Sequence, residues 1–235
     1  MDYASLCVNA GKDPVVYSDA GRYVCRAIRT KTVTAQDTLS AIIASYAKPV
    51  LEKGDILFIC EKMVACTQGR AFPADSVRAG RLAKILCKFV TKSKAGIGLA
   101  MPQTMQCAIN ECGAARILLA AAAGMLGKVF GKKGWFYKVA GYRAACIDGP
   151  CHNTIPPYNK CVVLAPLNPQ KAAEEASGML GGGAVLIVDA NDLGVRILGS
   201  SNCGLDKSQI ASLLRQNPLG QSNESTPMGI LRPVQ

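Results

Sequence analysis

The clearest pattern of apolar and polar positions lies at residues 184–194, where five apolar residues run directly into Asp189, Asn191 and Asp192. A short apolar run bounded by turn residues predicts a strand that is buried on both faces. Open α/β sheets bind ligands at the carboxyl ends of such strands. The acidic residues therefore have two interpretations, an Asx-type turn or a functional site, and the pattern leaves both open.

The same kind of pattern, read along the chain, predicts alternating strands and helices. Asp206 with Gln209 predicts the start of a helix, as do Thr34 with Asp37 and the Asn168-Pro169 pair. Residues 117–126 are too few to span a bilayer and predict a buried helix whose small residues allow close packing. Further strands are predicted at 24–33, 56–60, 135–141, 144–150, 162–165 and 228–232, and further helices at 34–48, 76–90 and 106–126 with a break at Gly113. These elements predict an α+β (mixed α/β) protein.

The amino-acid composition indicates a sizeable hydrophobic core and a strong positive charge. The 235 residues are 49% hydrophobic and 18% charged, so the chain can bury a sizeable core. The net charge of +11 indicates an anionic partner, which is nucleic acid, an anionic membrane or a polyphosphate ligand. Basic residues are densest at 78–94 and 128–138, although a solvated face explains either zone equally well. Aromatic residues are too few for a base-stacking platform, which disfavours nucleic acid.

The eleven cysteines do not predict disulfides or a zinc site. Their number is odd, no C-x-x-C occurs, and His152 is the only histidine. The chain shows no signal-peptide pattern, so we expect a cytoplasmic protein with reduced cysteines. Cys151 and His152 are disfavoured as a nucleophile and base, because adjacent residues rarely face each other. Small buried hydrophobic positions are predicted at Cys60, Cys66, Cys87, Cys146 and Cys161.

Candidate phosphate-binding residues follow one of the predicted strands. The strand at 56–60 is preceded by Gly54-Asp55 and followed by Lys62, and Gly69-Arg70 comes one element later. A lysine at the end of a strand can place its ammonium group on a phosphate, although a plain surface lysine is equally consistent with this stretch. The basic glycine-containing residues 127–135 do not form a P-loop, because no Gly-Lys-Ser/Thr closes them.

Several of these stretches together resemble one family. Residues 54–70 and 219–232 resemble the coenzyme F420-0:L-glutamate ligase (F420-0 gamma-glutamyl ligase) family, and residues 134–141, 147–150 and 188–194 resemble a divergent bacterial branch of it. The resemblance covers most of the chain after about residue 25. It implies one domain of this type over residues 1–235, divided into two lobes, and a cytoplasmic homodimer that is not a membrane protein.

The resemblance also implies the chemistry. A GTP- or ATP-dependent ligase would add L-glutamate through an amide bond to a small-molecule carboxylate acceptor, with Mg or Mn as divalent metal. The γ-phosphoryl group passes to the acceptor carboxylate, and the glutamate amine then attacks the acyl phosphate. The sequence leaves the acceptor and the choice between GTP and ATP open.

The resemblance assigns roles to particular residues, each with a structural alternative. Gln221 and Glu224 match a Gly-Gln-x-x-Glu motif, although an exposed loop also explains them. For Glu111 a solvated helix residue is the favoured alternative, whereas Asp148 is equally consistent with a turn. Cys66 occupies the position of a second family lysine, so the alternative function is a non-catalytic nucleotide-binding relative. The predicted catalytic residues are Lys62 and Arg70; the nucleotide-binding residues are Arg29, Lys31, Lys62, Gln221 and Glu224; the metal ligands are Glu111, Asp148, Asp189 and Asp192.

Overall fold

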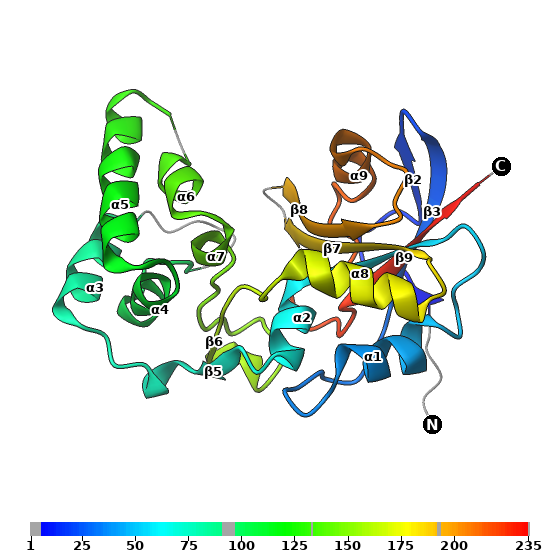
Figure 1. Cartoon of the computed structure of the whole chain (residues 1–235), viewed down its shortest axis with the longest axis horizontal. Helices are drawn as coiled ribbons and strands as arrows, with labels where there is room; N and C mark the ends of the chain where they lie inside the picture. Colours follow the sequence, from blue (N-terminus) through cyan, green and yellow to red (C-terminus); the bar gives the residue numbers. More distant parts are fainter. Residues whose placement is uncertain (1–5, 91–96, 133, 192–193, 235) are drawn as a thin grey trace. The chain divides into compact units, whose positions relative to one another are not determined.

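The computed structural model describes residues 6–90, 97–132, 134–191 and 194–234. The chain divides into two compact units (Figure 1). Residues 1–69 and 166–235 form the first, here called the sheet unit, and residues 70–165 form the second, here called the helical unit. The described residues form helices and a mostly antiparallel mixed sheet, so the predicted α+β class is confirmed.

The sheet unit is built around a seven-stranded sheet of order β1-β3-β9-β4-β7-β8, with β2 paired to β3. The pair β4–β7 is parallel and the other pairs are antiparallel. The strands are β1 (Leu6–Cys7), β2 (Val15–Ser18), β3 (Gly21–Ile28), β4 (Ile56–Cys60), β7 (Ala184–Asn191), β8 (Gly194–Ser201) and β9 (Met228–Pro233). The helices are α1 (Leu39–Ile42), which continues as a π-helical turn (Ile43–Ala47), α2 (Glu61–Thr67), α8 (Pro169–Met179) and α9 (Lys207–Leu213).

The central strands bury both of their faces, as the apolar runs predict. In β4, Leu57 and Ile59 pack into the core under α1, α2 and α8, whereas Ile56 and Phe58 pack into the core under α9. β7 divides its side chains between the same two cores. Successive side chains of a strand point to opposite faces, so a strand between two helical layers is apolar throughout. The layers of the sheet unit are visible on the right of Figure 1.

The helical unit surrounds a second core with helices and one small sheet. Its longest helices, α4 (Pro102–Cys112) and α5 (Ala114–Val129), are separated by Gly113 at φ 82°, as the sequence predicts. In the described residues no single helix is long and apolar enough to cross a membrane; α4 and α5 pass that test only together, bent by 117°. The other elements are β5 (Ala71–Pro73), α3 (Arg81–Leu86), α6 (Trp135–Ala140), α7 (Tyr142–Ala145), β6 (Cys161–Val163) and the 3-10 turns Ala74–Ser76, Cys87–Phe89 and Tyr158–Lys160.

The strands predicted at 135–141 and 144–150 are wrong, because residues 135–140 form α6 and residues 142–145 form α7. Of residues 146–150, only Asp148 makes a β-bridge, to Val163. The aromatic residues there favour a strand by propensity, but tertiary packing decides. Gly124 and Gly127 bring α6 against α5: a Cβ on Gly127 would lie 2.7 Å from a backbone carbonyl oxygen and 3.1 Å from the Trp135 ring. Because these two glycines have no side chain, α6 can pack closely against α5.

Helix starts are predicted well where the signal is complete. Asp206 accepts from the backbone N–H groups of Ser208 and Gln209, and the Gln209 side chain accepts from the Asp206 N–H, so the capping box is confirmed. The start at Thr34 is wrong, because Thr38 caps α1 by accepting from Ala41. Other predicted helix bounds shift: the segment 76–90 is helical only from 81, and α4 begins at 102 instead of 106.

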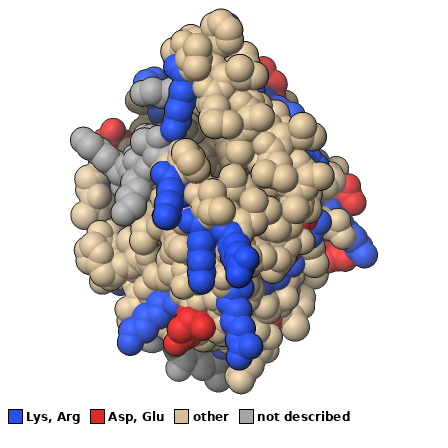
Figure 2. All heavy atoms as spheres, turned by 90° about the vertical axis from the view of Figure 1, so that its left-hand side faces the viewer, with Lys and Arg blue, Asp and Glu red and all other residues tan. Residues whose placement is uncertain are grey.

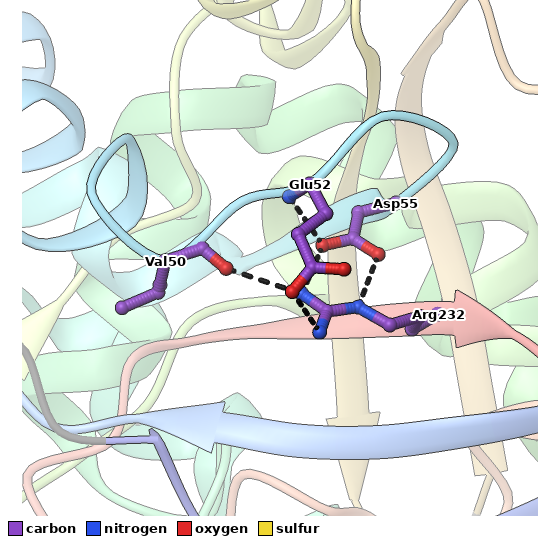
Figure 3. A network of polar contacts seen from close by, with 4 residues as sticks. All are labelled: Val50, Glu52, Asp55 and Arg232. Atoms are coloured by element: carbon purple, nitrogen blue, oxygen red, sulfur yellow. Dashed lines mark hydrogen bonds and ion pairs between the residues drawn. The ribbon is translucent and has the colours of Figure 1, made fainter.

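A buried ion pair fixes the turn before β4 to the last strand (Figure 3). Arg232 on β9 donates two hydrogen bonds of 2.8 Å to the two carboxylate oxygens of Asp55, whose side chain is 1% exposed. The same guanidinium reaches Glu52 at 2.6 Å and the carbonyl oxygen of Val50 at 3.2 Å. These contacts raise the pKa of Arg232, the hydrogen bond to Asp55 most of all. The guanidinium thus closes the turn at residues 50–55.

Candidate functional site

One edge of the large sheet gathers five of the ten predicted site residues. Strand register pairs Met228 with both Ile28 and Ile59, and pairs Cys60 with Val188. The ends of β3, β4 and β7 and the start of β9 therefore lie along one edge, although they are far apart in the sequence. Chain segments leaving this edge carry Arg29, Lys31, Lys62, Glu224 and Asp189.

The loop before β9 is bonded to that edge. The Cys60 N–H donates to the Pro227 carbonyl at 2.8 Å, and the Thr30 N–H donates to the Ser225 carbonyl at 2.9 Å. Ser225 has a φ of 55°, a conformation that non-glycine residues rarely adopt and that is often retained at functional sites. These bonds place the loop between the residues that follow β3 and those that follow β4.

Glu224 is held inside this loop by its neighbours. Its carboxylate accepts the Ser222 N–H at 2.8 Å, and it covers Gly220, whose φ is 80°. The positive φ favours glycine at residue 220, and a Cβ there would lie 2.5 Å from the Glu224 carboxyl carbon and would displace this carboxylate. Glu224 is half-buried and Gln221 is exposed. The glycine of the predicted motif is therefore required for the position of its glutamate.

Charged side chains meet around Cys60 at the end of β4. Burial raises the pKa of the Cys60 thiol to about 12; the nearby carboxylates of Glu61 and Asp189 add to this rise and Lys62 opposes it. Lys62 is exposed, whereas Glu61 is 2% exposed. The sequence analysis missed Glu61, and the available signal was its place directly after a fully apolar strand. Lys62 and Asp189 thus share one electrostatic environment.

The two cations after β3 differ in their availability. Lys31 lies 2.6 Å from Asp37, and this contact raises the pKa of Lys31 and, with the Thr34 N–H, lowers that of Asp37. Arg29 is exposed. A phosphate approaching this edge would find Arg29 and Lys62 accessible, while Lys31 already has a carboxylate partner.

The residues at the acidic end of β7 belong to the strand and do not form a turn. β7 continues through Asp189 to Asn191, and Asp189 faces Arg196 of β8 in the strand register. The Asn191 side chain donates weakly to Asp189 at 3.3 Å. Asp192 lies outside the described residues. The Asx-turn interpretation is therefore wrong for Asp189.

A second polar cluster lies inside the helical unit. Arg70 donates to the Ala165 carbonyl at 2.6 Å and to Glu111 at 2.6 Å, and Arg143 lies 2.9 Å from the same Glu111 oxygen. Side-chain exposures are 12%, 13% and 40% for Arg70, Glu111 and Arg143. One carboxylate thus faces two guanidinium groups, and the buried Nε of Arg143 has no hydrogen-bond partner. The sequence analysis missed Arg143, because only the fold places it beside Glu111.

The predicted metal ligands that the structure describes, Glu111, Asp148 and Asp189, do not form one group. No cluster of three or more His, Cys, Asp or Glu side chains occurs where the chain is described. The Oε2 atom of Glu111 forms ion pairs with both Arg70 and Arg143. The backbone of Asp148 pairs with Val163 through bonds of 2.9 and 3.0 Å. Asp189, half-buried beside an asparagine amide, retains the chemistry of an Mg²⁺ ligand, since Mg²⁺ needs only one or two carboxylates when substrate phosphates supply the rest.

Comparison with known proteins decides the family. The F420-0:Gamma-glutamyl ligase family model matches residues 27–218. The chain belongs to this family. The resemblance inferred from the sequence is thereby confirmed, and the family is one of ligases. A search of the curated proteins found no match. The matched range includes β4, α2, β7 and the whole helical unit, and stops before Gln221 and Glu224.

Proposed function

We propose that this member of the F420-0:gamma-glutamyl ligase family is a nucleotide-dependent ligase. It would use GTP or ATP to join the amine of L-glutamate to a small-molecule carboxylate acceptor through an acyl phosphate. The observation that supports this most is the shared sheet edge, where Lys62 follows one strand, Arg29 another, and Glu224 lies in a loop bonded to both. Ligands of sheets that contain parallel strands bind at such carboxyl ends.

In this proposal the exposed cations of the edge bind the phosphates. Lys62 is the catalytic cation, because its ammonium can neutralise charge that develops on the transferring phosphoryl group. Arg29 binds the remaining phosphate oxygens, and Gln221 and Glu224 offer an amide and a carboxylate to the polar groups of the nucleotide. Lys31 remains a predicted nucleotide-binding residue, although its ammonium group is ion-paired with Asp37. When the amine attacks the acyl carbon, the phosphate that was transferred to the acceptor leaves as inorganic phosphate, and the amide bond forms.

Arg70 is proposed to bind an anionic group of the acceptor. Glu111 and the Ala165 carbonyl fix its guanidinium, so the group is oriented before a substrate arrives. Because Arg143 shares the same carboxylate, the three side chains retain one net positive charge. Glu111 is then a positioning residue for two arginines rather than a metal ligand.

A divalent metal, Mg or Mn, would accompany the nucleotide. Asp189 would hold it, and the metal would supply positive charge beside the phosphates. Asp148 and Asp192 remain predicted ligands. The cytoplasmic location and the homodimer implied by the resemblance also remain predictions.

The proposal is tested by thermal shift and by turnover with Lys62→Ala. A ligand that binds only the folded chain raises the melting temperature. We expect GTP or ATP with Mn²⁺ to raise it, Lys62→Ala to reduce the shift, and Lys53→Ala to leave it unchanged. Lys53 is the matched control, because it is an exposed lysine on the turn before β4, at the other end of that strand. The absence of any shift with either nucleotide would contradict the proposal.

A non-catalytic nucleotide-binding relative is the second candidate, and the burial of Cys66 favours it. Cys66 occupies the position of a family lysine and is 6% exposed in α2, packed where an ammonium group would be costly. This candidate predicts nucleotide binding without release of phosphate for any carboxylate acceptor. Release of phosphate that depends on acceptor and L-glutamate excludes it.

A further inference from the structure

The net charge of the chain resides in one unit. Residues 70–165 contain 14 lysines and arginines against three aspartates and glutamates, whereas the rest of the chain contains 13 of each. The helical unit therefore carries the entire +11 and the sheet unit is neutral. Figure 2 shows lysine and arginine side chains gathered beside a broad neutral area on the α3 and α5 side of the helical unit. The proposed nucleotide chemistry uses cations of the neutral unit and leaves this charge unexplained.

The same side of the helical unit exposes large apolar side chains. α5 buries Ile117 and Ala120, but its other face exposes Leu119 at 66% and Val129 at 80%. Leu118, Met125 and Leu126 are also about half exposed on this helix, and Ala122 is exposed between them. The predicted buried helix is therefore buried on one side only, and positions 118, 122, 125 and 129, which are three or four residues apart, form a continuous exposed stripe. Exposed stripes of this kind mark interaction surfaces.

Apolar and basic side chains form one surface. The Lys128 ammonium at the end of α5 donates to the Phe89 carbonyl at 3.0 Å, which joins the end of α5 to the 3-10 turn Cys87–Phe89. Phe89 and Phe130 are 61% and 67% exposed, and Lys88, which lies in the same turn, is also exposed. We call this the α5 face: the outer residues of α5 with Phe130, and residues 84–89.

We propose that the α5 face docks on an anionic membrane surface. Exposed apolar side chains beside lysines are what peripheral helices use, inserting the apolar groups at the headgroup level while the cations bind anionic lipid. Nucleic acid would satisfy the charge but leave aliphatic side chains such as Leu119 and Val129 without an apolar partner. A second copy would cover the apolar groups but bring two units of +11 together. An anionic bilayer complements both features, because its headgroups bind the cations and its acyl region accepts the apolar side chains.

The test is flotation of the full chain with lipid vesicles. Vesicles of phosphatidylcholine with about one quarter phosphatidylglycerol should bind the protein, pure phosphatidylcholine vesicles should bind it far less, and rising salt should weaken binding. The double variant Val129→Ser/Phe130→Ser should lower the affinity about tenfold, since two exposed apolar groups lose their burial. Lys84→Glu/Lys88→Glu should abolish the preference for anionic vesicles.

Controls come from exposed positions of the neutral unit. Tyr17→Ser, at a residue that is 65% exposed, and Lys171→Glu should bind vesicles as the unmodified chain does. Circular dichroism should show all variants folded, because every substituted side chain is exposed. Equal binding to neutral and anionic vesicles, or none to either, overturns the proposal. Sedimentation that shows a dimer lost in Val129→Ser/Phe130→Ser, without vesicle binding, overturns it in favour of self-association, and salt-sensitive binding to an oligonucleotide alone overturns it in favour of nucleic acid.

Discussion

Replacing Arg232 by methionine removes the cationic partner of a carboxylate that has almost no access to water. Asp55 would keep one hydrogen bond, from the Glu52 N–H at 2.8 Å, in place of three. Breaking a buried ion pair in this way costs about 3–5 kcal/mol. Arg232 itself is 29% exposed, so water can enter the vacated space, and we expect about 3 kcal/mol at the lower end of that range.

Glu52 provides the matched comparison. Its oxygen lies closer to Arg232 than those of Asp55, at 2.6 Å, but its side chain is 67% exposed. Exposed pairs contribute about 0–1 kcal/mol, so Glu52→Ala should have little effect on the free energy of unfolding. Burial and not distance would then determine the contribution of each pair.

Urea unfolding monitored by circular dichroism measures both effects. Arg232→Met should lower the urea midpoint by about 1–2 M with an unchanged slope, and Glu52→Ala should move it by a few tenths at most. The double variant Asp55→Leu/Arg232→Met should recover part of the loss, since no unpaired buried charge remains. The reasoning is refuted if Glu52→Ala costs as much as Arg232→Met, or if Arg232→Met costs less than about 1 kcal/mol.

Three further predictions follow from single positions. Gly229→Ala should lower the urea midpoint strongly, because its Cβ would lie 2.3 Å from the buried Phe58 ring. Gly220→Ala should displace Glu224 and weaken the nucleotide-dependent thermal shift more than it lowers the melting temperature without ligand. Hydrogen bonds from Ser208 and Gln209 lower the pKa of Asp206, so its stabilisation is present above the ordinary aspartate pKa and disappears as the pH falls through the lowered value; the difference in urea midpoint between the unmodified chain and Asp206→Ala should therefore shrink in acid.

Part of the site could be predicted from the sequence because its signals are local. Lys62 follows an apolar strand, Glu224 follows a glycine motif, and both lie where the structure forms one sheet edge. Arg143 was missed, because its importance comes from a distant partner that no short stretch encodes. Glu61 was missed although its place directly after an apolar strand was a local signal. Asp189 was found, but as an end of a strand that in fact continues past it.

The sequence by itself determined the buried strands β4 and β7 and the capping box at Asp206. In each, neighbouring residues carry the whole signal, through the period of the side chains or through bonds across one turn. Only the tertiary structure decided that residues 135–145 are helical and that α5 leaves one face exposed. It also decided that Arg70 and Arg143 share one carboxylate. These features depend on which distant segments pack together, and burial against a distant segment can override local propensity.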